Sequence, residues 1–151
     1  PWWERVNPLW ATLRRSALDL LKKEQRLSEI VRLIGPDALP DDQRLILITA
    51  DLIKNGFLQQ NSFDEIDMYC VPDKQIQILS LILEFHERAM AIIKMGAPLM
   101  TITALPVRER LARLKSEIKN EDKEAFIVFE RELRDSLETL ERKYKTKEAV
   151  L

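Results

Sequence analysis

Apolar residues near the start of the chain recur every three or four positions, which is the repeat of one face of an α-helix. Asn7 followed by Pro8 favours a helix start, and Gly35 followed by Pro36 favours a helix end. Only Glu24 interrupts the apolar series, which comprises Trp10, Leu13, Ala17, Leu20, Leu27, Val31 and Ile34. We therefore predict one long amphipathic helix that ends in a tight turn.

The same repeat continues beyond this turn. A second helix is expected to start near Pro40 and Asp41 and to stop at Gly56, and a third, more apolar helix should run from Pro72 to Gly96. A helix that is apolar over most of its surface is expected at the centre of a bundle. The chain has only 3 glycines and no convincing strand pattern, so we predict an all-α fold, an irregular helical bundle. Its 151 residues, 46% of them hydrophobic, suffice for a single domain with one core.

The last third of the sequence carries two thin apolar stripes, and most residues between them are charged. This pattern predicts a charged helical hairpin over residues 106–145, turning near Asn120. The first stripe comprises Val107, Leu111, Leu114 and Ile118, and the second Phe126, Phe129, Leu133, Leu137, Leu140 and Tyr144. The outer faces of such a hairpin either remain solvated or form a docking surface for another helical protein.

Several classes of function lack their usual sequence features. The formal net charge of −1 gives no electrostatic reason to expect nucleic acid as a partner. No apolar run approaches the roughly 20 residues of a membrane span, so we expect no direct membrane insertion. The sequence contains no phosphate-binding loop, and its single histidine and single cysteine, His86 and Cys70, argue against a zinc site or a catalytic triad. We expect His86 to be hydrogen-bonded or at a helix surface rather than catalytic.

Two polar segments have simple structural interpretations. Asp41 and Asp42 stand at an expected helix start, where negative charge complements the helix dipole. The stretch NGFLQQNSF, residues 55–63, has no helical repeat and is typical of a loop that places Phe57 and Phe63 in the core. From the residues alone, the chain is a helical domain that is not a self-contained enzyme. A free-standing adaptor that binds a partner through its charged hairpin is one interpretation, and a small enzyme using His86 is another.

Three segments together resemble a known family. They read SEIVRLIGPDALPDDQR, ADLIKNGFLQQNSFDEIDMYC and VPDKQIQILSLILEF, in that order. Nearly the whole chain resembles the C-terminal helical domain of the catalytic A subunit of archaeal A-type ATP synthases, which are relatives of vacuolar-type ATPases. The first residues, PWWERVNPLW, contain no initiator methionine, so we expect this to be part of a longer protein.

The resemblance implies a function in ATP synthesis or hydrolysis coupled to proton or sodium transport. The phosphates and magnesium of ATP or ADP would be held by a nucleotide-binding domain that this sequence lacks, so the chain would not be active alone. The expected partners are that domain, the B subunits and the rotor subunits of the central stalk. The whole complex would lie in the cytoplasm, peripheral to the cell membrane.

The resemblance also implies two sites. The first completes a pocket for the adenine ring, because a flat ring needs an aromatic face and a few polar groups at its edge. Phe63 would stack on adenine beside Tyr69, Phe57 would pack behind, and the rim would comprise Gln59, Gln60 and Ser62.

The second implied site is a turn that faces the central rotor. It comprises Asp37, Ala38, Leu39, Pro40, Asp41, Asp42 and Gln43. Related rotary enzymes carry more acidic residues in this turn, where the present sequence has Ala38 and Pro40. We therefore expect a steric push from a stiff turn more than an electrostatic one. Helix capping accounts equally well for Asp41 and Asp42.

Overall fold

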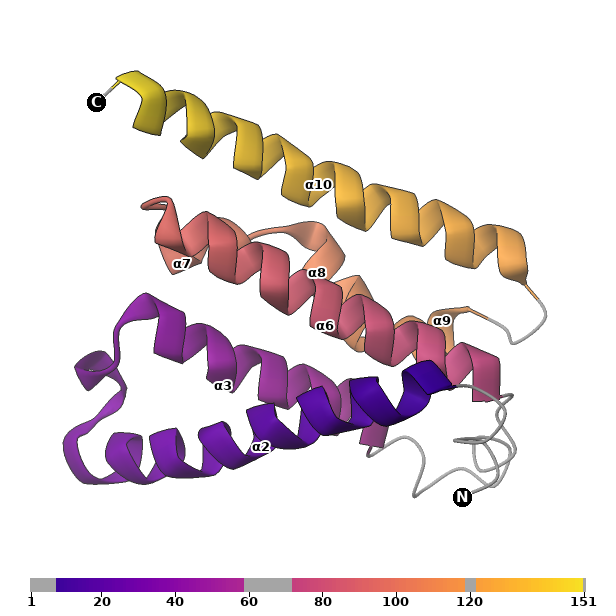
Figure 1. Ribbon diagram of the computed structural model, residues 1–151, viewed down its shortest axis with the longest axis horizontal. Helices are drawn as coiled ribbons and strands as arrows, with labels where there is room; N and C mark the ends of the chain where they lie inside the picture. Colours follow the sequence, from indigo (N-terminus) through magenta and orange to yellow (C-terminus); the bar gives the residue numbers. More distant parts are fainter. Residues whose placement is uncertain (1–7, 59–71, 119–121, 151) are drawn as a thin grey trace.

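The computed structural model describes residues 8–58, 72–118 and 122–150, and within these ranges the chain forms helices and no strand (Figure 1). The predicted all-α fold is confirmed for the described part of the chain. In chain order the elements are α2 (Pro8–Ile34), η1 (Pro36–Ala38), α3 (Asp41–Ile53), η2 (Lys54–Leu58), α6 (Pro72–Lys94), α7 (Leu99–Thr103), α8 (Pro106–Ala112), α9 (Leu114–Glu117) and α10 (Lys123–Val150).

Helix α6 occupies the centre of the fold, as its apolar sequence predicts. It contacts α2 and α3 on one side and α10 on the other, so the helices stack in layers (Figure 1). Ile78, Ile82, Phe85 and Ile92 along α6 are fully buried. Burying a side chain of this size contributes about 1.5–3 kcal/mol, so each residue of this row adds substantially to the stability of the core.

The polar interruption in the apolar face of α2 has a partner in the structure. Glu24 accepts a hydrogen bond from the hydroxyl of Ser28 at 3.0 Å and pairs with Lys54 at 2.9 Å. The hydrogen bond from Lys54 is the main reason that the pKa of Glu24 lies below its ordinary value. The carboxylate therefore joins α2 to the end of α3 without leaving a charge unpaired.

The prediction that Gly56 stops the second helix was wrong. The chain continues in helical form through Gly56 as the π-helical turn η2. A Cβ atom at this position would lie 3.2 Å from the carbonyl oxygen of Ala112 in α8. Gly56 therefore allows η2 to approach the backbone of α8 closely, and this is the role of the missing side chain.

The first arm of the predicted charged hairpin consists of two short helices and not of one continuous helix. Residues 106–117 form α8 and α9, and the helix is interrupted at Arg113, where φ is −109°. The interruption lies where both short helices contact η2. The apolar stripe is buried as its spacing indicates, and the buried Lys74 of α6 donates a hydrogen bond to the carbonyl of Ile118.

Helix α10 covers the free side of α6 and continues to Val150. Phe126, Phe129, Leu133, Leu137 and Tyr144 form its buried seam, as the heptad-like spacing predicts. The seam supplies the apolar attachment of α10 to the rest of the core.

Candidate functional site

The turn between α2 and α3 stands at one end of the molecule (Figure 1). Gly35 adopts φ of 92°, a value that favours glycine, and its N–H donates to the carbonyl of Val31 at 2.8 Å. Pro36 then starts η1, and Pro40 lies in extended conformation directly before α3. Leu39 between them is buried. Two prolines and one buried anchor make this turn stiff.

The residues expected to face the rotor lie partly in this turn and partly in the first turn of α3, which begins at Asp41. Asp37, Ala38 and Pro40 are exposed, whereas Asp41 to Gln43 are half-buried. Leu39 points into the fold and is 5% exposed, so it anchors the turn instead of offering a contact surface.

The two aspartates at the start of α3 both accept backbone hydrogen bonds. Asp42 Oδ1 accepts from the N–H of Gln43 at 2.9 Å, and Asp41 Oδ2 accepts from the N–H of Leu99 at 2.9 Å. Leu99 is the first residue of α7, so Asp41 satisfies a donor that the short helix cannot pair internally. Asp41 and Asp42 lie in the first turn of α3, where their charge complements the helix dipole as expected, but within the described ranges no side chain forms an N-cap hydrogen bond to α3. Sequence reasoning missed the partner of Asp41, because a residue 58 positions away gives no local signal.

A groove of about 530 Å³ lies between the start of α3 and α7, and sequence reasoning did not find it. Asp41 and Arg44 are its charged lining residues, and the side chains of Met100 and Arg44 are exposed. The remaining lining residues are Pro36, Leu47, Ile48, Pro98, Leu99 and Thr103. The groove is therefore largely apolar and adjoins the turn through Pro36.

Large apolar side chains are also exposed beside the turn. Leu33 and Ile34, at the end of α2, are 83% and 70% exposed, and Met100 at the groove is 76% exposed. Exposed apolar residues gathered at one end of a molecule are typical of a contact surface.

His86 is a hydrogen-bonded residue in the packing between α3 and α6. Its Nδ1 lies 2.5 Å from the hydroxyl oxygen of Thr49, which is fully buried. Burial and, to a smaller extent, the positive charge of Lys23 lower the pKa of His86 from 6.5 to about 4. The ring is therefore neutral near pH 7 and shares a hydrogen bond with the hydroxyl of Thr49, so the expectation of a hydrogen-bonded histidine is confirmed.

Most of the residues expected to hold adenine lie outside the described ranges, namely Gln59, Gln60, Ser62, Phe63 and Tyr69. Phe57 belongs to η2. The described elements on either side of this segment are η2, which continues α3, and α6, which begins at Pro72.

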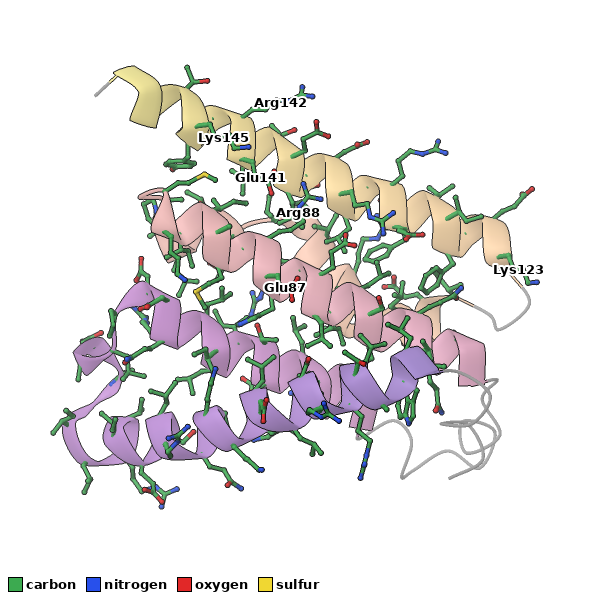
Figure 2. All side chains as sticks on the ribbon, in the orientation of Figure 1. Glu87, Arg88, Lys123, Glu141, Arg142 and Lys145 are labelled. Atoms are coloured by element: carbon green, nitrogen blue, oxygen red, sulfur yellow. The ribbon has the colours of Figure 1, made fainter. Side chains whose placement is uncertain are left out.

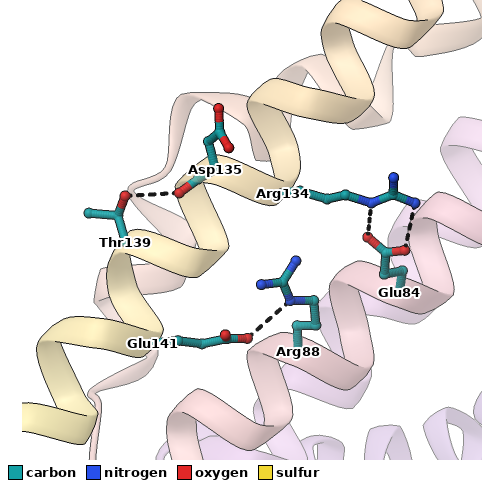
Figure 3. A network of polar contacts seen from close by, with 6 residues as sticks. All are labelled: Glu84, Arg88, Arg134, Asp135, Thr139 and Glu141. Atoms are coloured by element: carbon teal, nitrogen blue, oxygen red, sulfur yellow. Dashed lines mark hydrogen bonds and ion pairs between the residues drawn. The ribbon is translucent and has the colours of Figure 1, made fainter.

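Ion pairs hold α10 against α6 (Figure 3). The guanidinium of Arg134 donates to both carboxylate oxygens of Glu84 at 2.9 and 3.0 Å, and Arg88 pairs with Glu141 at 3.0 Å. These carboxylates raise the pKa values of both arginines. Figure 2 shows Arg88 and Glu141 directed toward each other, whereas Arg142 points away from the core. Some charged residues of the predicted hairpin therefore form ion pairs within the chain.

Residues 1–103 match the model of the family described as the C-terminal domain of V and A type ATP synthase. The chain belongs to this family. The matched residues include α2 to α7, and therefore both the turn and the groove. Within the described ranges, no helix is long and apolar enough to cross a membrane, and no group of three or more potential metal ligands occurs.

Curated relatives of this ATP synthase family support the assignment over a longer stretch. The A subunit of the A-type ATP synthase from Thermococcus onnurineus is 46% identical over 127 residues, which cover 83% of this chain and 22% of the relative. That of Desulfurococcus sp. is 44% identical over 144 residues, or 95% of this chain and 24% of the relative. The chain therefore spans about a quarter of these relatives and matches their C-terminal part. The longer alignment includes most of α8 to α10, which lie beyond the family model.

Proposed function

We propose that this domain works within the catalytic subunit of an ion-translocating A-type ATP synthase, where it completes the adenine pocket and contacts the central rotor. Nucleotide phosphates and magnesium would bind to another domain of the same polypeptide, so the chain alone would not turn over ATP. Its partners would be that domain, the B subunits and the rotor subunits of a complex peripheral to the membrane. Membership of the ATP synthase family supports the proposal.

The observation that supports the rotor contact most directly is that the turn between α2 and α3 is built to be stiff. Pro36 and Pro40 restrict its backbone, and Asp41 ties the start of α3 to α7. A turn that must push another body needs resistance to bending more than a high charge. The buried anchor Leu39 adds to this resistance, because movement of the turn would expose it.

The adenine part of the proposal rests on residues 57–69 and on their place in the chain. They follow α3 through η2 and precede α6, and α3 is the helix that begins at the turn. A nucleotide bound by this segment would therefore act on α3, which is continuous with the proposed rotor-facing turn. This connection supports one function for both sites.

Loosening the turn tests the proposed rotor contact. Replacing Pro36 and Pro40 by glycine restores backbone freedom worth about 0.4–1 kcal/mol at each position. In single-molecule rotation driven by ATP, the complex carrying both substitutions should stall at a lower torque than the unmodified complex, because a turn with a freer backbone bends under load. ATP hydrolysis without load should stay unchanged.

Asp37→Ala is the matched control, because it removes an exposed charge from the same turn and leaves both prolines in place. A steric contact predicts normal torque in this variant. If the double glycine variant kept normal torque and Asp37→Ala had reduced torque, the steric contact would be refuted and an electrostatic contact favoured.

A further inference from the structure

We propose that the groove between α3 and α7 receives a bulky apolar side chain of the rotor that has a carboxylate beside it. This inference rests on the proposed rotor contact and adds the chemistry of the surface that the rotor must present. The groove adjoins the turn, since Pro36 of η1 lines one of its walls. A body that touches the exposed turn is therefore placed to reach the groove as well.

The shape and lining of the groove fit an apolar occupant. Its volume of about 530 Å³ lies within the range of roughly 300–1,000 Å³ that is usual for ligand pockets, so a large side chain has room to enter. Leu47, Ile48 and Leu99 offer apolar walls, and Met100 stands exposed among the lining residues. A methionine side chain can adapt to an incoming surface, because its thioether chain is flexible and polarisable.

The charges of the groove favour an acidic neighbour for that occupant. Asp41 already accepts a hydrogen bond from the N–H of Leu99, and its charge complements the start of α7. Arg44 is exposed, and within the described ranges it forms no ion pair. The groove is lined by one negative and one positive residue, and Arg44 is the more exposed of the two, whereas Asp41 is half-buried and hydrogen-bonded to Leu99. A carboxylate on an incoming surface would therefore pair with Arg44. An apolar wall beside Arg44 excludes water from a bound carboxylate and strengthens the pairing.

A photo-cross-linking amino acid at position 100 tests this assignment in the full-length polypeptide, assembled with its B and rotor subunits. The exposed side chain of Met100 makes the replacement compatible with folding. We expect the cross-linked peptide, identified by mass spectrometry, to come from a rotor protein and to contain an apolar residue close to Asp or Glu. A cross-link to a B subunit, to a second copy of this chain or to another part of the same polypeptide would overturn the inference, as would the absence of any cross-link.

Arg44 provides a second measurement of the same contact. Reversing its charge in Arg44→Glu should lower the yield of the rotor cross-link from position 100 by at least about fivefold, because like charges now oppose each other. Arg44→Lys keeps the charge and should retain most of the yield. Equal yields of the rotor cross-link from Arg44→Glu and Arg44→Lys would overturn the inference that a rotor carboxylate lies beside the groove.

Two further probe positions separate the failure of this inference from that of the proposed function. The same photo-cross-linker at position 37, on the exposed turn, reports the rotor contact itself. Rotor cross-links from position 37 without any from position 100 would refute the groove and leave the rotor contact standing, whereas their absence from both positions would refute both. Val128 on α10 provides a control position, because its apolar side chain is 51% exposed. A rotor cross-link of equal yield from that position would show that the label is unselective and would overturn the assignment to the groove.

Discussion

His86 should make the stability of the domain depend on pH between about 4 and 6.5. In the folded chain its pKa lies near 4, because burial disfavours the charged ring and Lys23 adds positive charge nearby. In the unfolded chain the ring is hydrated and its pKa returns to 6.5. Between these values the unfolded state binds more protons than the folded state. Stability is therefore fully present above pH 6.5 and is lost as the pH falls toward 4.

The size of this effect follows from the two pKa values. At about 1.4 kcal/mol for each tenfold change in proton affinity, the full difference would be about 3 kcal/mol. The ring of His86 is partly exposed, so solvent screening reduces the expected effect to about 2 kcal/mol. The native free energy of unfolding is usually about 5–15 kcal/mol, so a loss of this size is readily measured.

Urea unfolding of the chain at pH 7, 5 and 4, followed by circular dichroism, measures the effect. His86→Gln is the matched variant, because the glutamine amide can donate to or accept from the hydroxyl of Thr49 but does not titrate. The free energy of unfolding of the unmodified chain should fall more steeply with decreasing pH, by about 2 kcal/mol over this range, than that of the variant. Parallel pH profiles for the two chains would refute the burial argument for His86.

The remaining predictions concern the two proposed sites. Phe63→Ala in the assembled complex should weaken nucleotide binding by about 1–3 kcal/mol, or roughly 5- to 150-fold, measured by nucleotide titration. Val128→Ala is its distant control, and unchanged affinity in Phe63→Ala would remove that residue from the adenine pocket. Asp41→Ala should lower the free energy of unfolding of the chain by about 1–2 kcal/mol, because the N–H of Leu99 loses its acceptor. Urea unfolding measures this loss, and Asp41→Asn should recover part of it; an unchanged midpoint in the alanine variant would contradict the capping role.

The sequence predicts helices well where the signals are local. Pro8 and Gly35 mark the bounds of the first helix, and the apolar repeat identifies buried positions such as Leu45 and Phe85. Prolines and glycines act through their own backbone geometry, so these signals need no knowledge of the rest of the fold. Such signals also place α6 at the centre, because its apolar residues cover more than one face.

Sequence reasoning missed or misinterpreted features that depend on contacts between residues far apart in the chain. Gly56 resembles a helix stop, yet its role is the close approach to Ala112, which only the packed structure contains. The interruption at Arg113 lies where η2 packs on the short helices, and the apolar stripe continues across it unchanged. The groove beside Met100 was missed for the same reason, because α3 and α7 meet there from separate parts of the chain.

The length of α3 bears on how the two proposed sites could act together. Its 13 residues rise about 1.5 Å each, so the turn that we propose contacts the rotor lies about 20 Å from η2, at the start of the predicted adenine segment. A rotation of α3 by about 6° around the η2 end would then move the turn by about 2 Å, the size of a helix shift at an interface between subunits. The salt bridge between Glu24 and Lys54 lies near the η2 end of α3, where such a rotation displaces it least. The hydrogen bond that Asp41 accepts from the N–H of Leu99 lies near the turn. Because Asp41 ties α3 to α7, such a rotation would move the turn and the groove together as one surface, which is the arrangement that the proposed steric push requires.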